Sequence, residues 1–494
     1  NAPVILDTVT FSTEKGGYRD SVFQLADFGR LQKKLSARRD QRFRDELVKK
    51  DQEQIASWVS SQGYAYASVD PNISLSADTS TAALEWQIKK GPLCHFGDIA
   101  VKGVERTPEE AIRRQFEVAK GDIYSSRNMA QTQRQVYELG LFRIASLQAL
   151  HDAGGNDTIP LELTIREAPR FSVRYGVGYG REDRFRTFVD LRWLNFPGAT
   201  QRTKFYAKHS GLEPYRFETT ITQPAIFGPR SSMAFNPYVR ARDEAGFESF
   251  VWGGDLSLHQ SLGEHLTASA AIYFERVDID VASSFEWSEG DRSISTYSKN
   301  GVSMGMLFNN SNPRFDPVEG WSLAFNTRAN SSLFGSPYPF VKYLFEIKRF
   351  HSMTNGFVLA ARLKSGSVIP AGNATTIPVE ERFFAGGSQS VRGWARQMLG
   401  PMDDENVPVG GRSLLEGSVE PRVEVIDPVS VVAFFDFGNV WRDENHFNWA
   451  DIRYAAGGGV RVSTPIGPVG IDVGRPVFEE KDGWQLHLNI GHAF

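Results

Sequence analysis

The pattern of hydrophobic and polar positions changes character near Pro169. Before that residue, helix-like and strand-like stretches alternate, whereas nearly all of the later chain has the period of two that is typical of a half-buried β-strand. The alternation recurs in WSLAFNTRAN (321–330) and in the final WQLHLNIGHAF (484–494). In FSVRYGVGYG (171–180) one face carries Phe171, Val173, Tyr175, Val177 and Tyr179, and the other carries Ser172, Arg174, Gly176, Gly178 and Gly180.

The two faces of these strands indicate where they lie. The polar face carries Arg, Lys, Asn and Gly, and the apolar face carries aromatic residues near strand ends, as expected for a barrel with a wet interior and lipid outside. An open sheet of this size would leave edges to cover, and closure removes them. Residues 170–494, at about 20 residues per strand and connection, predict about 16 strands. We therefore expect an all-β membrane protein with an antiparallel transmembrane β-barrel.

The N-terminal third contains an internal repeat. Residues 54–92 and 131–169 each follow the order helix, glycine, strand, loop, strand. A glycine directly after a helix is the residue that most readily adopts a left-handed C-cap. The repeat is in constant register, because Val59 and Val136, Gly63 and Gly140, Leu84 and Leu161, Ile88 and Ile165, and Pro92 and Pro169 are all 77 positions apart.

An opening strand is expected before each repeat, at 5–11 and 96–104. The second unit adds a helix opened by Thr107-Pro108-Glu109-Glu110, with proline in the first turn and carboxylates at the positive end of the dipole. The matching stretch of the first unit, 30–50, is longer and charged, so an inserted or extended helix is expected there. Two α+β domains of order βααββ, at 1–92 and 93–169, should therefore precede a barrel at 170–494.

Composition excludes several classes of function. The balance of 55 basic and 59 acidic residues lacks the basic footprint of a nucleic-acid-binding protein. The single cysteine, Cys94, can form no intramolecular disulfide and is expected to be a small buried side chain. No run of 18 apolar residues predicts a membrane-spanning helix. No signal peptide is visible at Asn1, so an exported protein would be present in its mature form.

No constellation of residues predicts catalysis. The glycines of 176–180 lie inside an alternating strand with no helix after it, which argues against a dinucleotide-binding loop. The nine histidines show no spacing typical of metal ligands. We therefore predict no enzyme activity, no cofactor and no metal site.

The segment 381–416 is a long, glycine-rich excursion between two strands. It contains Phe383, Phe384 and further apolar residues, which predicts that it folds back and packs inside the barrel. Arg392 would then need an anionic partner. In VSVVAFFDFGNVW (429–441) the alternation points Asp436 and Gly438 inward, so Asp436 is a candidate. From the residues alone, a solvated Arg392 and a turn position for Asp436 remain the alternative.

Four motifs follow one another towards the C-terminus: Val391-Arg392-Gly393-Trp394, FFDFGNVW at 434–441, STPIGPVGIDVGRPV at 463–477, and Asn489, Gly491 and Phe494. In this order they resemble motifs of the BamA/TamA superfamily of outer-membrane assembly and secretion proteins, and the resemblance covers essentially the whole chain. The two N-terminal repeats resemble POTRA domains. The segments nearest the loop look most similar to the TamA branch, although this chain has two POTRA-like units rather than three, so a further unit would be absent from this sequence. In the first motif, Trp394 stands where Phe or Tyr is commoner in the family. The last motif, Asn489, Gly491 and Phe494, resembles the terminal signal by which barrel precursors are recognised.

The resemblance implies a location, partners and a structural role. The barrel would lie in the bacterial outer membrane, among its lipids, with the POTRA-like domains in the periplasm. Its substrates would be unfolded outer-membrane proteins or autotransporters, and an inner-membrane or periplasm-spanning protein similar to TamB would dock on the POTRA-like domains. Arg392 would pair with Asp436 and lock the inserted loop in the lumen.

The first and last strands suggest a mechanism. Gly176, Gly178 and Gly180 weaken the first strand, because glycine loses more entropy on folding and packs no side chain. The last strand is short and carries Gly491 near its end. We hypothesise that the seam between them opens sideways and templates a strand of an incoming substrate.

Three other functions remain open at this point. A polypeptide secretion pore of the two-partner type usually carries a plug helix ahead of its POTRA domains. No clear plug helix precedes residue 5, and 30–50 lies within the first unit. A passive porin with binding modules would be obstructed by the inserted loop. A barrel hydrolase would need a Ser, His and acid arrangement, which is not evident.

Overall fold

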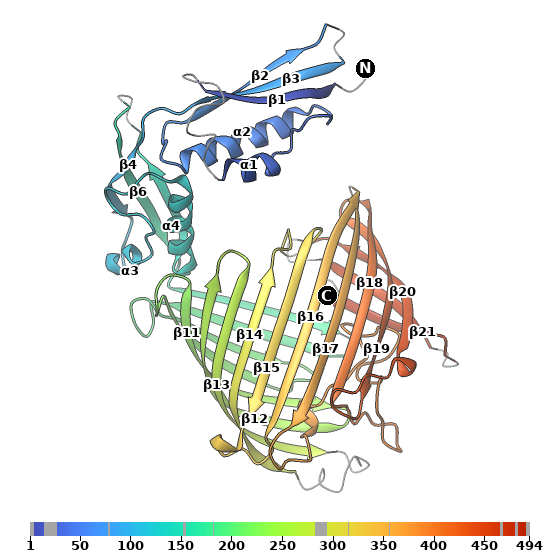
Figure 1. Cartoon of the computed structure of the whole chain (residues 1–494). Helices are drawn as coiled ribbons and strands as arrows, with labels where there is room; N and C mark the ends of the chain where they lie inside the picture. The colour runs from blue at the N-terminus through green and yellow to red at the C-terminus, as the bar shows by residue number, and fades with distance from the viewer. Residues whose placement is uncertain are drawn as a thin grey trace. The chain divides into compact units, whose positions relative to one another are not determined.

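The computed structural model describes residues 4–13, 27–77, 80–151, 155–180, 182–281, 294–314, 316–354, 356–464, 468–479 and 483–490. The chain divides into two compact units, which Figure 1 colours from blue to red along the sequence. The first comprises Asn1–Pro169 with Gly198–Thr200, and the second comprises Arg170–Pro197 and Gln201–Phe494.

The first unit contains two small α+β domains of the same topology. In each, the first strand pairs in parallel with the last strand, which also pairs antiparallel with the strand before it. The sheet orders are therefore β1-β3-β2 and β4-β6-β5. The elements are β1 (Ile5–Thr13), α1 (Phe28–Lys34), α2 (Asp45–Ser60), β2 (Ser68–Leu75) and β3 (Thr81–Lys89), and then β4 (His95–Lys102), α3 (Glu109–Arg113), α4 (Ser126–Glu138), β5 (Phe142–Ala149) and β6 (Thr158–Glu167).

The repeated positions form equivalent parts of the two cores. Val59 and Val136 are both fully buried on the second helix of their domains. Gly63 and Gly140 follow these helices with φ of 105° and 69°, a conformation that glycine adopts without steric cost. The same periodic residues therefore perform the same packing in both domains.

The stretch 30–50, where an inserted or extended helix is expected, contains the end of α1 and the start of α2 rather than one continuous helix. The chain leaves the helical conformation at Leu35 and begins α2 only at Asp45. Asp51 of α2 is fully buried and accepts hydrogen bonds from the backbone N–H groups of Ser36 and Ala37, at 2.6–2.9 Å. These amides are satisfied by a carboxylate rather than by a helical ladder, so the charged stretch divides into two helices.

The second unit is a 16-stranded sheet in which each strand pairs antiparallel with its neighbours in the chain. It curves into a nearly closed barrel (Figure 1), so the predicted strand number and fold class are confirmed. The strands are β7 (Phe171–Gly180), β8 (Arg184–Leu194), β9 (Arg202–His209), β10 (Arg216–Pro224), β11 (Ser231–Glu244), β12 (Phe247–Leu262), β13 (Leu266–Val281), β14 (Thr296–Asn309), β15 (Gly320–Asn330), β16 (Phe340–Thr354), β17 (Phe357–Pro370), β18 (Ser413–Ile426), β19 (Val429–Trp441), β20 (Arg453–Val462), β21 (Val469–Val477) and β22 (Gln485–Ile490).

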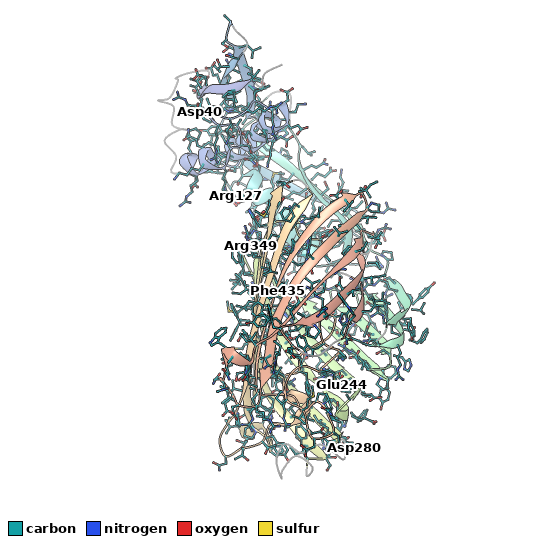
Figure 2. The ribbon with its side chains drawn as sticks, turned by 90° about the vertical axis from the view of Figure 1, so that its right-hand side faces the viewer. Asp40, Arg127, Glu244, Asp280, Arg349 and Phe435 are labelled. Carbon is teal, nitrogen blue, oxygen red and sulfur yellow. The ribbon has the colours of Figure 1, made fainter. Side chains whose placement is uncertain are left out.

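The two faces of the barrel differ in chemistry. On β19, Val431 and Phe435 are exposed on the outer face, while Asp436 is fully buried on the inner face. Figure 2 views the barrel from the side of the C-terminal strands and labels Phe435 among them. This apolar exterior and charged interior is the arrangement of a transmembrane barrel. Among the described residues, no helix is long and apolar enough to cross a bilayer.

Within the part of the barrel that the structure describes, short 3-10 helices lie between strands at η4 (Ser332–Phe334), η5 (Val379–Glu381) and η6 (Trp449–Asp451). The long connection between β17 and β18 spans 371–412, and we call it the inserted loop. The expected bounds of 381–416 therefore omit 371–380 and include the start of β18. Residues 413–415 belong to a strand because they pair with β17 and β19.

Candidate functional site

The inserted loop is packed inside the barrel. Val391 and Trp394 are buried in one apolar cluster with Val440 of β19 and Ala455 of β20. Phe383, near the start of the loop, belongs to the same cluster. Because the loop contacts inward-facing residues of several strands, it occupies the lumen rather than the surrounding solvent.

Arg392 is the most extensively bonded side chain of the loop. Its Nε and Nη2 donate to the two carboxylate oxygens of Asp436, both at 2.8 Å, which is the bidentate geometry that suits a guanidinium. Its Nη1 lies 2.7 Å from Glu420 and 3.4 Å from Asp472. The guanidinium carbon also lies 3.6 Å from the ring centroid of Phe434. The structure therefore brings together the two residues that the sequence nominated.

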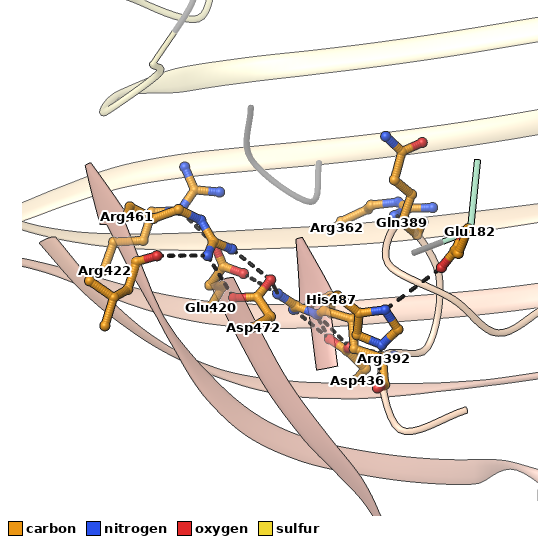
Figure 3. Close-up of polar contacts among 12 residues, drawn as sticks. Glu182, Arg362, Gln389, Arg392, Glu420, Arg422, Asp436, Arg461, Asp472 and His487 are labelled. Atoms are coloured by element: carbon orange, nitrogen blue, oxygen red, sulfur yellow. Dashed lines mark hydrogen bonds and ion pairs between the residues drawn. The ribbon is translucent and has the colours of Figure 1, made fainter. Parts of the chain in front are cut away.

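Two further arginines extend this contact into a network (Figure 3). Arg461 of β20 forms two bonds with Asp472 of β21, at 2.6 and 2.7 Å, and Arg422 lies 2.8 Å from Glu420 on β18. All of these side chains are more than nine-tenths buried. With Arg392 and Asp436, three guanidinium groups face three carboxylates. Their charges balance, which is what allows ionised groups to remain away from water.

The network joins the loop to consecutive strands of the wall. Glu420, Asp436, Arg461 and Asp472 belong to β18, β19, β20 and β21 in turn. His487 of β22 completes the series, since its Nε2 lies 2.9 Å from the backbone oxygen of Arg392. Arg392 is therefore bonded directly to β18, β19, β21 and β22. It is linked to β20 through Asp472 and Arg461.

Glycine permits the close approach of the loop to the wall. A Cβ at Gly393 would lie 2.6 Å from the Cβ of Ala455 and 2.9 Å from backbone atoms of 475 and 476. A Cβ at Gly438 would lie 2.5 Å from the backbone oxygen of Leu415. Contacts this short leave no space for a side chain, so both motif glycines are explained by packing.

A second ionic cluster holds the beginning of the loop. Glu381 of η5 lies 2.7 Å from Lys299 of β14 and 3.4 Å from Lys342 of β16. Lys299 also lies 3.0 Å from Glu275 of β13. The loop is therefore anchored on both sides of the lumen, to β13–β16 near its start and to β18–β22 near its tip.

Sequence reasoning missed most of the partners of Arg392. Glu420, Arg461 and Asp472 were not singled out, although strand alternation places each of them on an inward face. Asp472 lies within the segment 463–477 that carried the family resemblance. Alternation identifies the face of a side chain but not its neighbours, so it could have nominated these residues without pairing them.

The nominated terminal strands lie at the two ends of the sheet. Among the described residues, no backbone pairing joins β7, with Gly176, Gly178 and Gly180, to β22. The aromatic ring of Phe188 on β8 covers Gly176. Asn489 pairs with Gly470 through the backbone of β22. Gly491 and Phe494 lie outside the described residues.

Comparison with known proteins agrees with this architecture. Residues 195–494 match the Omp85 superfamily domain, and 29–91 and 94–168 match the POTRA family, described as surface antigen variable number repeat. The chain is 22% identical over 469 residues to the outer membrane protein assembly factor BamA of Nitratidesulfovibrio vulgaris, covering 92% of this chain and 58% of that protein. It therefore spans little more than half the length of this relative.

Solved structures show the same fold. The crystal structure of BamA from Haemophilus ducreyi lacking POTRA domains 1–3 matches with a TM-score of 0.68 and 17% identity, covering 98% of both chains. CdiB from Acinetobacter baumannii matches with a TM-score of 0.53 and 13% identity, covering 99% of this chain and 89% of CdiB. The particular similarity to TamA stays a prediction.

These matches locate the two parts of the protein. The barrel lies in the outer membrane and the POTRA domains lie in the periplasm, as the resemblance implied. The family assignment rests on a match that covers more than half of the chain, from β9 to its end, together with two POTRA matches before it. The chain belongs to the Omp85 superfamily, and the given sequence holds two POTRA domains and a 16-stranded barrel with an inserted loop packed in its lumen.

Proposed function

We propose that this protein assembles other polypeptides into the outer membrane, with unfolded β-barrel proteins or autotransporters as substrates. The observation that carries the proposal is the unpaired seam, because β7 and β22 share no backbone pairing within the described residues. A barrel that served only as a passive pore would gain stability from closing that edge.

The seam offers a template for a substrate strand. Unpaired N–H and C=O groups along a strand edge can pair with an extended chain, as in strand addition. Tyr175, Val177 and Tyr179 of β7 are among the most exposed apolar residues of the barrel, at 73–80%. A substrate strand with an alternating apolar face would cover them while it pairs with the edge.

The POTRA domains supply edges in the periplasm. β2 and β5 are the outer antiparallel strands of their sheets, and Leu75 and Ile144 on them are exposed. A groove of about 720 Å³ runs between α4 and β5 and is lined partly by Tyr137 and Arg143. These surfaces support the docking of unfolded substrates and of a TamB-like partner.

The anchored loop favours assembly over free passage through the lumen. A loop fixed in the lumen by ionic clusters near its start and near its tip would obstruct a permanently open channel. Assembly of this kind needs no chemical reaction and no cofactor of the protein. A polypeptide secretion pore remains the competing function, and it requires the loop to leave the lumen.

A folding assay separates these functions. Urea-unfolded barrel protein is added to lipid vesicles with and without this protein, and the rise of the heat-resistant folded band is timed. Acceleration that is lost in Arg392→Ala, when that variant is itself folded, is the expected result. Absence of acceleration together with ion conductance would contradict assembly and favour the secretion pore.

A further inference from the structure

Glu182, in the turn between β7 and β8, contacts two other parts of the barrel. Its Oε1 lies 3.7 Å from Nδ1 of His487 on β22, the last strand. The same oxygen accepts a 3.4 Å hydrogen bond from the backbone N–H of Ser388 in the inserted loop. Its Oε2 lies 3.8 Å from Nη1 of Arg396, also in the loop. The carboxylate of Glu182, in the first hairpin, thus contacts both the last strand and the inserted loop.

His487 lies on β22, on the other side of the seam, and is 5% exposed. Its Nε2 faces the backbone oxygen of Arg392, so that nitrogen must carry the proton and donate. Its Nδ1 faces Glu182, and this contact is an ion pair when the imidazole is protonated on both nitrogens. The imidazole therefore lies between the loop residue that is most firmly anchored and the hairpin that begins the barrel, as Figure 3 shows.

The backbone of the loop is shaped for this contact. Gly386 and Gly387 have φ of 98° and 110°, a backbone conformation that residues with a side chain rarely adopt. A Cβ at Gly387 would lie 3.4 Å from Oε1 of Glu182, in direct contact with the carboxylate. The glycine pair therefore turns the chain so that the N–H of Ser388 points at Glu182.

Residues 386–397, which we call the loop tip, also contact β11, another of the N-terminal strands of the barrel. Arg396 forms two bonds with Glu244 at the end of β11, at 2.8 and 3.2 Å. Gln397 donates to the same carboxylate at 3.0 Å. The tip thus joins β11 and the β7–β8 turn to the C-terminal strands, although the two end strands share no backbone pairing among the described residues.

We propose that Glu182 and His487 are positioning residues that fasten the first hairpin and the last strand to the loop tip. The loop then holds the two unpaired end strands near each other, and the seam widens only when the tip is displaced. The consequence for substrate entry rests on the proposed function. The fastening itself is a property of the empty protein and can be measured without a substrate.

The contacts of Glu182 are long and partly exposed, which suits a reversible fastening. Ion pairs of this kind contribute little individually. Arg392, in contrast, is held by short bonds in a buried network. The contacts of Glu182 are therefore the weaker attachment of the loop, and a substrate strand could displace them. The bonds of Arg392 are the stronger attachment.

The test measures the width of the seam in the full-length protein. Spin labels are placed on the outward-facing positions Val173→Cys and Leu488→Cys in a Cys94→Ala background, in vesicles of phosphatidylcholine and phosphatidylglycerol, and distances are measured by pulsed EPR. Glu182→Ala should increase the widened population about two- to fivefold, equivalent to about 0.4–1 kcal/mol. Glu182→Gln should have a smaller effect, because its amide oxygen still accepts from Ser388.

The matched control is Asp183→Asn. Asp183 is the neighbouring acid and lies 3.6 Å from Arg186 within its own hairpin. This variant removes the same charge and should leave the seam as in the parent. In an Arg392→Ala background the anchor is already lost, so Glu182→Ala should add no further opening. That non-additivity would not arise from a merely structural role in the hairpin.

Two results would overturn the inference. One is an equal seam width in Glu182→Ala, Asp183→Asn and the parent, with all three giving the heat-resistant folded band. The other is a full effect of Glu182→Ala in the Arg392→Ala background, which would mean that Glu182 does not act through the loop. An unchanged seam with normal assembly would refute only the inference, whereas altered seam widths without assembly would refute only the proposed function.

Discussion

Lys299 and Glu381 are separated by 82 positions in the sequence, yet Nζ of Lys299 lies 2.7 Å from Oε1 of Glu381, with both side chains buried. This ion pair fixes the start of the inserted loop to the barrel wall before the chain reaches Arg392. The loop is therefore held at two separate places, and each can be weakened independently.

Substitution of Lys299 by Met should destabilise the barrel by about 3 kcal/mol, because it leaves the carboxylates of Glu381 and Glu275 buried with one cation fewer. The measurement is the temperature at which the heat-resistant folded band disappears. Combining Lys299→Met with Glu381→Gln should recover part of the loss. A double variant whose loss of stability equals or exceeds the sum of the two single losses would contradict this pairing.

Substitution of Arg392 by Lys should reduce assembly activity almost as much as substitution by Ala. Lysine keeps the positive charge but cannot make the two parallel bonds to Asp436 while also bonding Glu420. We expect at least about a fivefold slower rise of the folded substrate band for a loss of about 1 kcal/mol. Protease digestion reports whether the loop is released. Wild-type rates with Lys would show that charge alone is sufficient.

Substitution of Gly393 by Ala should displace the loop, because the added Cβ meets Ala455 and backbone atoms of 475 and 476. Overpacking of this kind costs about 1–3 kcal/mol. Gly483→Ala is the control, since no heavy atom lies within 4 Å of its Cβ position. Equal protease sensitivity of the loop in the two variants would argue against the packing explanation.

A disulfide across the seam should stop assembly. Cysteine pairs are introduced along 173–179 of β7 and 486–488 of β22 in a Cys94→Ala background, and the fastest-forming pair is used. Activity should fall when the pair is oxidised and return when it is reduced. Full activity of the oxidised form, with crosslinking verified by gel mobility, would exclude lateral opening.

The second POTRA domain should lose local stability in acid. Burial raises the pKa of Glu167, but backbone N–H groups of Arg106, Thr107 and Glu105 and the guanidinium of Arg106 outweigh it and lower the pKa to about 2. Because the folded pKa is depressed, the stabilisation is complete above about pH 4.5 and is lost as pH falls towards 2.

Hydrogen exchange of peptides covering 105–107 tests this prediction in the full-length protein. Protection factors, corrected for the intrinsic effect of pH, should fall between pH 5 and pH 2.5. In Glu167→Gln they should be low throughout and vary little. Protection that is constant with pH in the parent would mean that the Glu167 carboxylate does not hold these amides.

Much of this architecture follows from local pattern. The period of two that begins at Phe171 predicted the barrel, because alternate side chains of a strand must face different solvents. The length of the chain after Pro169 predicted the strand number. The constant register of Val59 with Val136 predicted two equal domains. The break at Leu35 was not predicted, because it depends on Asp51, which lies on another helix.

The ionic network shows the limit of such reasoning. Arg392 was nominated because the apolar loop that carries it was expected to fold into the barrel, and Asp436 because strand alternation points it inward. Their functional role stays a prediction. Glu420, Arg461 and Asp472 stand in strands where many polar residues alternate, and nothing local distinguishes them.

The sequence by itself therefore determined most of the elements and their faces, since these depend on residues within a few positions of one another, and the order of its motifs indicated the family. Only the tertiary structure decided which charges meet. The path of the inserted loop places Arg392 beside Asp472, 80 positions away, and Ser388 beside Glu182, 206 positions away. Such neighbours are set by strand register and loop packing, because alternation specifies the face of a residue but leaves its partner across the lumen open.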